Sequence, residues 1–301
     1  MKLVNRILHY ICKTNEEPGI WTERIVCDIL NIPFNTNRDY LTEQNYPHKL
    51  KKDLCSSFKP FLESLNITQH LGNENTYYDF KTQNGQTVSL KTNINGNKVC
   101  AQTIGQTSLQ KFNEKTNSNF ENIIDYKNAI LSDTKRMTNL YLSHLFCCQH
   151  LISLKFDKGK IYYFKKINDK KPVSFNNSHN ILFNYSKDLS SWNNSMTLLL
   201  MTQGVFKSFA EFQIHTSRNC IQCRFNLDTL ITMVEHNMLT NIKLEVFDLK
   251  YKYNIKVLKH KFEEIPLRQS SSLIKDNGTI TQSNTLAEPI EEPAKKKRKR
   301  N

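Results

Sequence analysis

The stretch that decides the fold runs YYDFKTQNGQTVSLKTNINGNKVCAQTIGQ over residues 77–106. Its first part alternates aromatic and polar side chains over residues 77–82, which is typical of a half-buried strand. The Asn-Gly pair at residues 84–85 has the composition of a two-residue hairpin turn, and residues 87–92 continue as a second strand. The sequence therefore predicts a β-hairpin at the start of this stretch.

A third strand is expected at residues 98–103, after a second Asn-Gly pair at residues 95–96. Three successive strands joined by tight turns form a β-meander. In the first hairpin, antiparallel pairing would place Asp79 near residues 91–92, within one residue of register. Asp79 and Lys91 are therefore expected to meet across two neighbouring strands.

Asp79 and Lys91 carry the minimum chemistry for metal-assisted phosphodiester hydrolysis. A carboxylate holds a hard divalent cation, and a lysine orients or deprotonates the attacking water. Ser89 and Lys91 would share one face of their strand while Leu90 points into the core, and the backbone carbonyl of Leu90 is a further candidate metal ligand. The alternative is an ordinary surface hairpin with one exposed Asp and one exposed Lys, a common pairing on polar strand faces.

Asp79, followed ten residues later by Ser89-Leu90-Lys91, resembles the motif of the PD-(D/E)XK nuclease superfamily, and within it the type II restriction endonucleases. Further blocks resemble restriction-enzyme-like proteins, including those of large DNA viruses. These blocks are Trp21-Thr22-Glu23, residues 89–93, residues 98–102 with 104–106, and residues 211–215 followed by Arg218. The resemblance implies an α/β fold with a mixed central β-sheet flanked by helices.

The resemblance also implies an activity. We expect a Mg²⁺-dependent hydrolase that cleaves double-stranded DNA at a short sequence, in which Asp79 holds the metal and Lys91 the water. Gln102 is a further site candidate. Cutting both strands of a two-fold symmetric sequence suits a homodimer. The recognition sequence, the geometry of the cut and a partner methyltransferase have no signature in the chain.

The chain departs from the superfamily pattern at two positions. Tyr78 stands where proline is usual, and Ser89 replaces the middle acidic residue, so a charged metal ligand is missing. Some members with serine there take the carboxylate from a helix elsewhere. Glu23, in a helix expected over residues 21–30, is the first candidate to supply it, and Glu114 is the second. For Glu23 the alternative is a solvated first-turn glutamate that favours the helix dipole.

Hydrophobic periodicity along the rest of the chain predicts further helices and strands. Helices are expected at residues 47–65, over most of 120–150, and at 227–236. Strands are expected at residues 151–156, 160–166, 181–185, 196–201, 242–249 and 253–258.

Residues 211–225 predict a second hairpin. Gln213 and His215 alternate with apolar residues on its first strand, and Arg218 and Arg224 follow on the return. Because Gln pairs with adenine and Arg with guanine in the major groove, this ribbon is predicted to contact DNA. The alternative is a polar face without a ligand.

The 301-residue chain carries a formal charge of +14, from 42 Lys and Arg against 28 Asp and Glu. Six of the positive charges lie in residues 295–300, which leaves +8 for the rest of the chain. An excess of this size favours a polyanionic partner, although chains rich in Lys and Asn also arise from AT-rich genomes.

From about residue 266 the periodicity stops, so a nuclease domain over residues 1–265 and a disordered tail over 266–301 are expected. The end of the tail resembles a monopartite nuclear localisation signal, formed by Lys295, Lys296, Lys297, Arg298, Lys299 and Arg300. It implies a nuclear import carrier and a location in the nucleus, or, for a viral protein, in the host nucleus or virion. The alternative is a polybasic arm that adds phosphate affinity.

Eight cysteines, without a secretory signal or a membrane-length apolar run, predict a reducing compartment and mostly buried thiols. A structural zinc is the alternative, at Cys220 and Cys223 or at a cluster of His144, Cys147, Cys148 and His150. On a strand, however, the sulfurs of Cys220 and Cys223 would face opposite sides. No glycine-rich phosphate loop occurs, which disfavours a nucleotide hydrolase.

The sequence favours a Mg²⁺-dependent, sequence-specific endonuclease over two rival classes. One is a structure-directed nuclease of repair or recombination, which would cut junctions or flaps without sequence preference. The other is a DNA-binding protein without catalysis, in which Ser89 at the acid position marks an inactive site. No membrane partner is expected.

Overall fold

The computed structural model describes residues 7–12, 16–35, 47–72, 78–94, 96–186, 192, 194–215 and 220–257. The chain divides into two compact units, Met1–Lys259 and His260–Asn301, and the described residues all belong to the first. The predicted tail with its basic cluster at residues 295–300 lies outside the described residues, and so does Arg218. None of the described helices combines the length and the apolar character needed to span a membrane.

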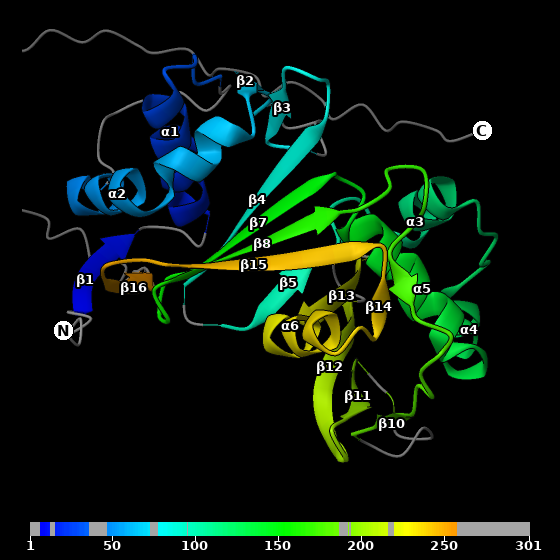
Figure 1. Cartoon of the computed structure of the whole chain (residues 1–301). Coiled ribbons are helices and arrows are strands. Elements are labelled where there is room, and N and C mark those ends of the chain that lie inside the picture. The colour runs from blue at the N-terminus through cyan, green and yellow to red at the C-terminus, as the bar shows by residue number, and fades with distance from the viewer. Residues whose placement is uncertain are drawn as a thin grey trace, which may run out of the picture. The chain divides into compact units, whose positions relative to one another are not determined.

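Six helices occur in the described part of the chain (Figure 1). They are α1 (Glu17–Leu30), α2 (His48–Ser64), α3 (Leu109–Thr116), α4 (Ile123–Ser132), α5 (Thr134–Leu145) and α6 (Leu227–Glu235). The helix predicted over residues 120–150 is two helices, because Asp133 ends α4 and its side chain accepts a hydrogen bond from the Arg136 N–H to cap α5. Residue His150, at the end of that prediction, already begins a strand.

One of the larger sheets is mixed, as predicted, and contains the two strands of the quoted hairpin. Its strand order is β15-β8-β7-β4-β3-β2. The strands are β15 (Ile242–Asp248), β8 (Lys160–Lys166), β7 (His150–Lys155), β4 (Thr87–Asn93), β3 (Phe80–Thr82) and β2 (Ile67–His70). β4 and β7 pair in parallel, and the other neighbours are antiparallel.

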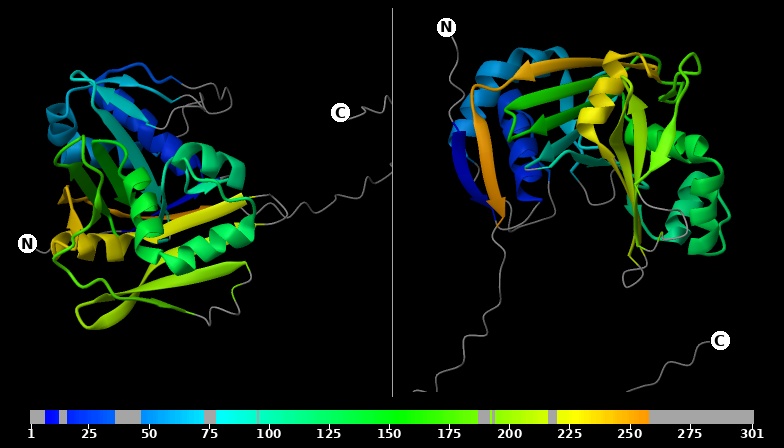
Figure 2. Two further views of the ribbon diagram at one scale, coloured as in Figure 1. Left: turned by 90° about the vertical axis from the view of Figure 1, so that its right-hand side faces the viewer. Right: turned by 90° about the horizontal axis from the view of Figure 1, so that it is seen from below.

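The other larger sheet is antiparallel throughout and was not anticipated. It contains β10 (Phe183–Tyr185), β11 (Ser195–Thr202), β12 (Val205–His215), β13 (Cys220–Asn226), β5 (Lys98–Cys100) and β6 (Gln106–Thr107). Two small sheets complete the described strands. β1 (Ile7–Cys12) lies parallel to β16 (Lys252–Val257), side by side in Figure 2, and β9 (Ser174–Phe175) pairs with β14 (Leu239–Thr240). Sequence analysis missed β1.

The first hairpin has a different register from the one predicted. It closes around a three-residue loop in which Gly85 has a φ of 78°, a left-handed conformation that glycine adopts without strain. Phe80 consequently pairs with Val88. Asp79 therefore lies beside Ser89 and Leu90, not beside residues 91–92, so the expected strand-to-strand meeting of Asp79 with Lys91 is wrong in register.

The predicted third strand of the meander does not join the hairpin. β5 pairs with β13 of the antiparallel sheet, because the edge of β4 that lies opposite β3 is already occupied by β7. The prediction of a three-stranded meander is therefore wrong, although a strand does form at Lys98–Cys100. β5 therefore pairs with β13, which is distant in the sequence, and not with the neighbouring strand β4.

The mixed sheet has a hydrophobic core on each face, because strand side chains alternate between faces. One face packs against α1 and α2 and buries Val88, Leu90 and Ile152 (Figure 1). The opposite face contributes Leu151 and Phe164 to a second core, shared with α5, α6 and the antiparallel sheet. β7 is buried along its whole length, as is usual for a strand covered on both faces.

The helix α2 carries a buried carboxylate that ties it to β16. Asp53 is 2% exposed. It accepts hydrogen bonds from the backbone N–H groups of Lys250 (2.7 Å) and Tyr251 (3.0 Å) and from the hydroxyl of Tyr253 (2.7 Å). A buried charge is tolerated only with such partners, so Asp53 holds the start of β16 against α2.

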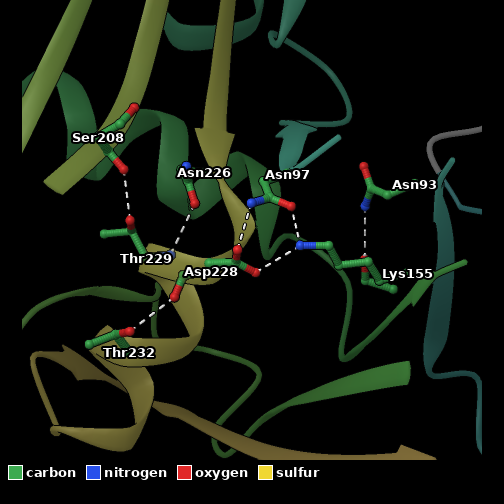
Figure 3. A network of polar contacts seen from close by, with 9 residues as sticks. Asn93, Asn97, Lys155, Ser208, Asn226, Asp228, Thr229 and Thr232 are labelled. Carbon is green, nitrogen blue, oxygen red and sulfur yellow. Dashed lines mark hydrogen bonds and ion pairs between the residues drawn. The ribbon is translucent and has the colours of Figure 1, made fainter. Parts of the chain in front are cut away.

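A second buried charge connects β7 to α6 (Figure 3). The side chain of Lys155 is fully buried, and its ammonium donates to Asn97 and to Asp228 Oδ1 (2.9 Å). The amide of Asn97 donates in turn to Asp228 Oδ2 (2.5 Å). Asp228 stands in the first turn of α6, where a carboxylate also interacts favourably with the helix dipole.

We expect the two members of this pair to respond differently to substitution. Asp228→Ala leaves a buried ammonium without its charged partner, which typically costs about 3–5 kcal/mol of unfolding free energy. Lys155→Met keeps an apolar chain of similar volume and leaves a half-exposed carboxylate to water, so we expect a loss below about 1.5 kcal/mol. Urea unfolding of both variants measures the difference, and equal losses would contradict this account.

Candidate active site

Asp79 lies at the edge of β4, at the point where β3 has not yet begun. Its backbone N–H donates to the carbonyl of Val88 (3.0 Å). Its carboxylate accepts from the backbone N–H of Leu90 (2.5 Å), through Oδ2. The side chain thus takes the place of a missing strand partner, and the backbone of β4 fixes the orientation of the carboxylate.

Ser89, at the position of the missing acid, is fully buried and serves as a hydrogen-bond donor. Its hydroxyl donates to the same Oδ2 atom of Asp79 (3.0 Å). Both bonds use Oδ2, so Oδ1 of Asp79 has no hydrogen-bond partner among the described residues. One carboxylate oxygen is therefore held by the protein and the other is left for a ligand.

Lys91 follows on the same face of β4 as Ser89, as the strand period predicts. It is half-buried, and no hydrogen bond or ion pair engages its ammonium within the part of the chain that the structure describes. Because the N–H and C=O of one residue point to the same strand edge, the carbonyl of Leu90 faces the edge at which Asp79 lies. The edge thus presents oxygen ligands and an unpaired cation.

Glu23 is brought to this edge by α1. The helix begins at Glu17, before the predicted residue 21, with Pro18 in its first turn. Burial raises the pKa of Glu23, the hydrogen bond from His70 lowers it, and the nearby carboxylate of Asp79 raises it further, so that the pKa lies above its ordinary value. The ammonium of Lys91 also acts on Glu23, in the opposite direction. Glu23, Asp79 and Lys91 therefore lie within electrostatic range of one another.

Glu114, the second candidate for the missing carboxylate, is placed differently. It is exposed on α3, where it accepts a hydrogen bond from Gln110 (3.1 Å), and no described contact joins it to Asp79. Gln102 hydrogen-bonds with the thiols of Cys147 and Cys148, each at 3.8 Å. The structure thus places Glu23 within electrostatic range of Asp79 and gives Glu114 no described contact with it.

Gln102 is connected to the candidate site through Cys148. Burial raises the pKa of this thiol to about 12, and the charges of Lys91 and Asp79 also act on it. Cys148 is therefore a neutral, buried thiol within electrostatic range of both residues. Gln102 itself has no described contact with Asp79 or Lys91, so its role as a site residue stays a prediction.

The donor set at this edge has the chemistry of a magnesium ligand shell. Among the described residues, no group of three or more His, Cys, Asp or Glu side chains is placed to hold a metal ion. Mg²⁺, however, usually keeps several waters and takes only one or two carboxylates from the protein. Asp79, Glu23 and the Leu90 carbonyl supply hard oxygen ligands of this kind, so the residues fit the ion.

The alternative zinc sites are not formed in the described structure. Cys223 is fully buried in the core and Cys220 is only half-buried. This is expected for two residues three positions apart on a strand, whose side chains face opposite sides. Burial raises the pKa of Cys223 well above its ordinary value, so the thiol is neutral. The group around His144 and His150 likewise forms no ligand cluster among the described residues. All eight cysteines are free and none is exposed.

The predicted ribbon over residues 211–225 does form, within β12 and β13, but its described charged residues, Glu211 and Arg224, pair with each other. Arg224 donates to Glu211 Oε2 (2.6 Å), and Lys98 of β5 donates to the same atom. Gln213 donates to Glu211 Oε1 (3.0 Å). His215 is half-buried and pairs in register with Cys220. Glu211, to which sequence analysis gave no role of its own, thus organises this surface.

Sequence analysis also missed His70, a buried histidine at the end of β2. Its Nε2 atom lies 3.2 Å from Oε2 of Glu23. No local pattern joins these residues, because 47 positions separate them along the chain. The weak available signal was a lone histidine closing a short strand that precedes the motif.

The chain is similar to the type II restriction enzyme CviAII of Paramecium bursaria Chlorella virus 1, with 28% identity over 231 residues. The match covers 74% of this chain and 61% of the relative, so the chain spans about three fifths of the length of that enzyme. No family model matches the chain, and no solved structure matches it. The relative belongs to the class that the motif blocks resemble, while membership of the PD-(D/E)XK superfamily and the restriction-endonuclease fold stay predictions.

The Glu211 cluster predicts a pH-dependent contribution to stability. Burial acts to raise the pKa of Glu211, but the hydrogen bonds from Lys98 and Arg224 outweigh it, and the pKa lies below its ordinary value. A carboxylate with a lowered folded-state pKa stabilises the protein above the unfolded value of about 4.3, and this stabilisation is lost as the pH falls through the folded value. Glu211→Gln should therefore lower the unfolding free energy at pH 7 by about 1–3 kcal/mol.

Thermal or urea unfolding as a function of pH measures this effect. The difference between Glu211→Gln and the unsubstituted chain should shrink as the pH falls below about 4.3. Glu235→Gln, at an exposed position of α6, serves as the control and should stay within about 0.5 kcal/mol of the unsubstituted chain. A difference that is the same at pH 3 and pH 7 would contradict the charge-based account.

Proposed function

We propose that this chain is a divalent-metal-dependent endonuclease of the type II restriction kind, which hydrolyses phosphodiester bonds of double-stranded DNA. The observation that carries the proposal is that the Asp79 carboxylate is fixed on β4 through one oxygen, while Glu23 lies within electrostatic range of both Asp79 and Lys91. The likeness to a type II restriction enzyme supports the reaction class. Sequence specificity and the choice of Mg²⁺ are parts of the proposal.

Each residue has a defined part in the proposed reaction. Asp79, Glu23 and the Leu90 carbonyl would hold Mg²⁺, which supplies Lewis-acid stabilisation of charge on the phosphate. Ser89 and the Leu90 N–H keep the Asp79 carboxylate in one orientation. The unpaired ammonium of Lys91 orients the attacking water and offsets charge that develops on the scissile phosphate.

The proposed DNA contacts lie on the β12–β13 ribbon. Gln213 and His215 present polar atoms at half-buried positions, and the positive charge of the chain suits the phosphate backbone. Arg224 would have to exchange its ion pair with Glu211 for a DNA group. Arg218, outside the described residues, is proposed on the sequence pattern alone. A homodimer would suit cleavage of both strands.

A DNA-binding protein without catalysis is the second candidate, and one observation favours it. Ser89 hydrogen-bonds where the superfamily pattern has an acid, and no three-residue ligand group occurs among the described residues. In that case the same surface would bind DNA without cutting it.

Plasmid cleavage in Mg²⁺ tests the proposed function. The unsubstituted chain should give discrete fragments, and Asp79→Ala, Lys91→Ala and Glu23→Ala should each lose at least about a hundredfold in rate, since each removes a group that acts on the reacting phosphate or its water. End-mapping of the fragments exposes a recognition sequence if there is one.

Glu114→Ala is the matched control, because it removes the rival carboxylate from an exposed helix position. It should cleave at the unsubstituted rate. If Glu114→Ala loses activity while Glu23→Ala keeps it, the assignment of the second carboxylate is wrong. If the plasmid stays intact in both Mg²⁺ and Mn²⁺ and the chain retards DNA on a gel, the proposal of a nuclease is wrong. The non-catalytic DNA-binding protein is then the better proposal.

A further inference from the structure

His70 is a buried residue whose two ring nitrogens are both engaged. Its side chain is 1% exposed at the end of β2. The ring stacks on Phe34 at a centroid distance of 4.7 Å and lies 5.1 Å from the ring of Phe80. Nδ1 accepts a hydrogen bond from the backbone N–H of Asn35 (3.0 Å), and Nε2 lies 3.2 Å from Glu23 Oε2. The imidazole therefore bridges the backbone at residue 35 to the carboxylate of α1.

The direction of these bonds follows from the donor at Asn35. A backbone N–H can only donate, so Nδ1 of His70 must be the unprotonated nitrogen. Nε2 then carries the hydrogen and donates it to Glu23. The Asn35 side chain secures this arrangement, since its amide donates to the backbone carbonyl of His70 (3.1 Å). Two bonds between the same residues fix both the tautomer and the orientation of the ring.

The backbone of Gly72 passes close to the His70 ring. A Cβ atom on Gly72 would lie 2.2 Å from Cε1 of His70 and 2.4 Å from the carbonyl oxygen of Asn35. Both distances are too short for a side chain, so the chain passes over the ring only because residue 72 has none. The ring is thereby confined between two aromatic side chains, a backbone N–H and a close backbone segment.

We propose that His70 is a positioning residue that holds the Glu23 carboxylate for a divalent cation shared with Asp79. The proposal rests on the function proposed above. Glu23 stands on a helix, whereas Asp79 is fixed by the backbone of β4, so the helix carboxylate needs a separate support. His70 engages Oε2, and Oε1 has no hydrogen-bond partner among the described residues. Each carboxylate thus has one oxygen held by the protein and one left over.

Mn²⁺ binding by isothermal titration calorimetry, on the full chain without DNA, tests this role separately from cleavage. His70→Phe keeps an aromatic ring but removes the Nε2 donor, and we expect the dissociation constant for Mn²⁺ to rise about tenfold or more, as is typical for the loss of an outer-shell partner. His70→Gln can restore an N–H donor at a similar reach, so its dissociation constant should lie within about threefold of the unsubstituted value.

His150→Phe is the matched control. His150 is equally buried, stacks on Tyr163 and hydrogen-bonds to Tyr163 and Gln86, but it has no described contact with Glu23. It should cost similar thermal stability and leave Mn²⁺ affinity unchanged. Unchanged affinity in His70→Phe, or an equal loss in His150→Phe, would overturn the proposal, as would an unsubstituted chain that binds no Mn²⁺.

Two further results keep the test decisive. If His70→Phe does not fold, Asn35→Ala takes its place, because it removes the amide that donates to the backbone carbonyl of His70 and leaves the ring in the chain, and unchanged Mn²⁺ affinity there would overturn the proposal. If the unsubstituted chain binds Mn²⁺ with an affinity that falls in Asp79→Ala and in His70→Phe but cuts no DNA, the nuclease function fails while the positioning role stands. If it cuts DNA and His70→Phe cuts and binds Mn²⁺ equally well, the positioning role fails alone.

Discussion

The structure around the candidate site depends on the backbone N–H of Leu90 finding a partner. β4 is paired on one edge with β7 from Val88 to Asn93, but on the other edge β3 pairs only with Thr87 and Val88. A buried N–H without an acceptor is costly, and the carboxylate of Asp79 supplies one. The same bond that completes the sheet thus places an acidic side chain at an open strand edge, beside the hydroxyl of Ser89.

The buried charges of this protein fall into two kinds. Asp53 and Lys155 are surrounded by donors and acceptors from the protein itself, so they connect secondary-structure elements and need nothing further. Glu23 and Asp79 instead act on each other as like charges at a partly buried edge, and each keeps one oxygen without a described partner. The nearby charge of Asp79 disfavours ionisation of Glu23, and a bound cation would reverse that effect. The candidate site therefore differs from the structural ion pairs because each of its two carboxylates keeps one oxygen without a described hydrogen-bond partner.

Local patterns in the sequence predicted most of the longer elements, although not β1, but they did not predict the pairing of strands that are distant in the sequence. Alternation and turn chemistry predicted the hairpin of β3 and β4, and the same reasoning predicted β7 with β8. The register of the first hairpin could not be predicted, because a two-residue and a three-residue loop share the Asn-Gly signature. Pairing of β5 with β13 and of β4 with β7 joins residues far apart in sequence, and no local period encodes it. His70 was missed for the same reason, since a buried polar residue whose partner is remote has no sequence signature.

In the proposed nuclease site, Ser89 stands where the superfamily pattern has an acid, and this changes how the site would have to be built. A carboxylate at that position would be fixed by β4 itself, two residues before Lys91. With serine there, the hydroxyl donates to Asp79, and in the proposed site the second carboxylate would come from α1, so the distance between the two acids would depend on how α1 packs against β4. That packing is close, because a Cβ atom on Gly19 would lie 3.5 Å from Oγ1 of Thr92. The order of a site shared between a strand and a helix depends on the contacts that join the two elements. In the proposed site, the hydrogen bond between His70 and Glu23 would hold the helix carboxylate in place, which a site confined to the strand would not need.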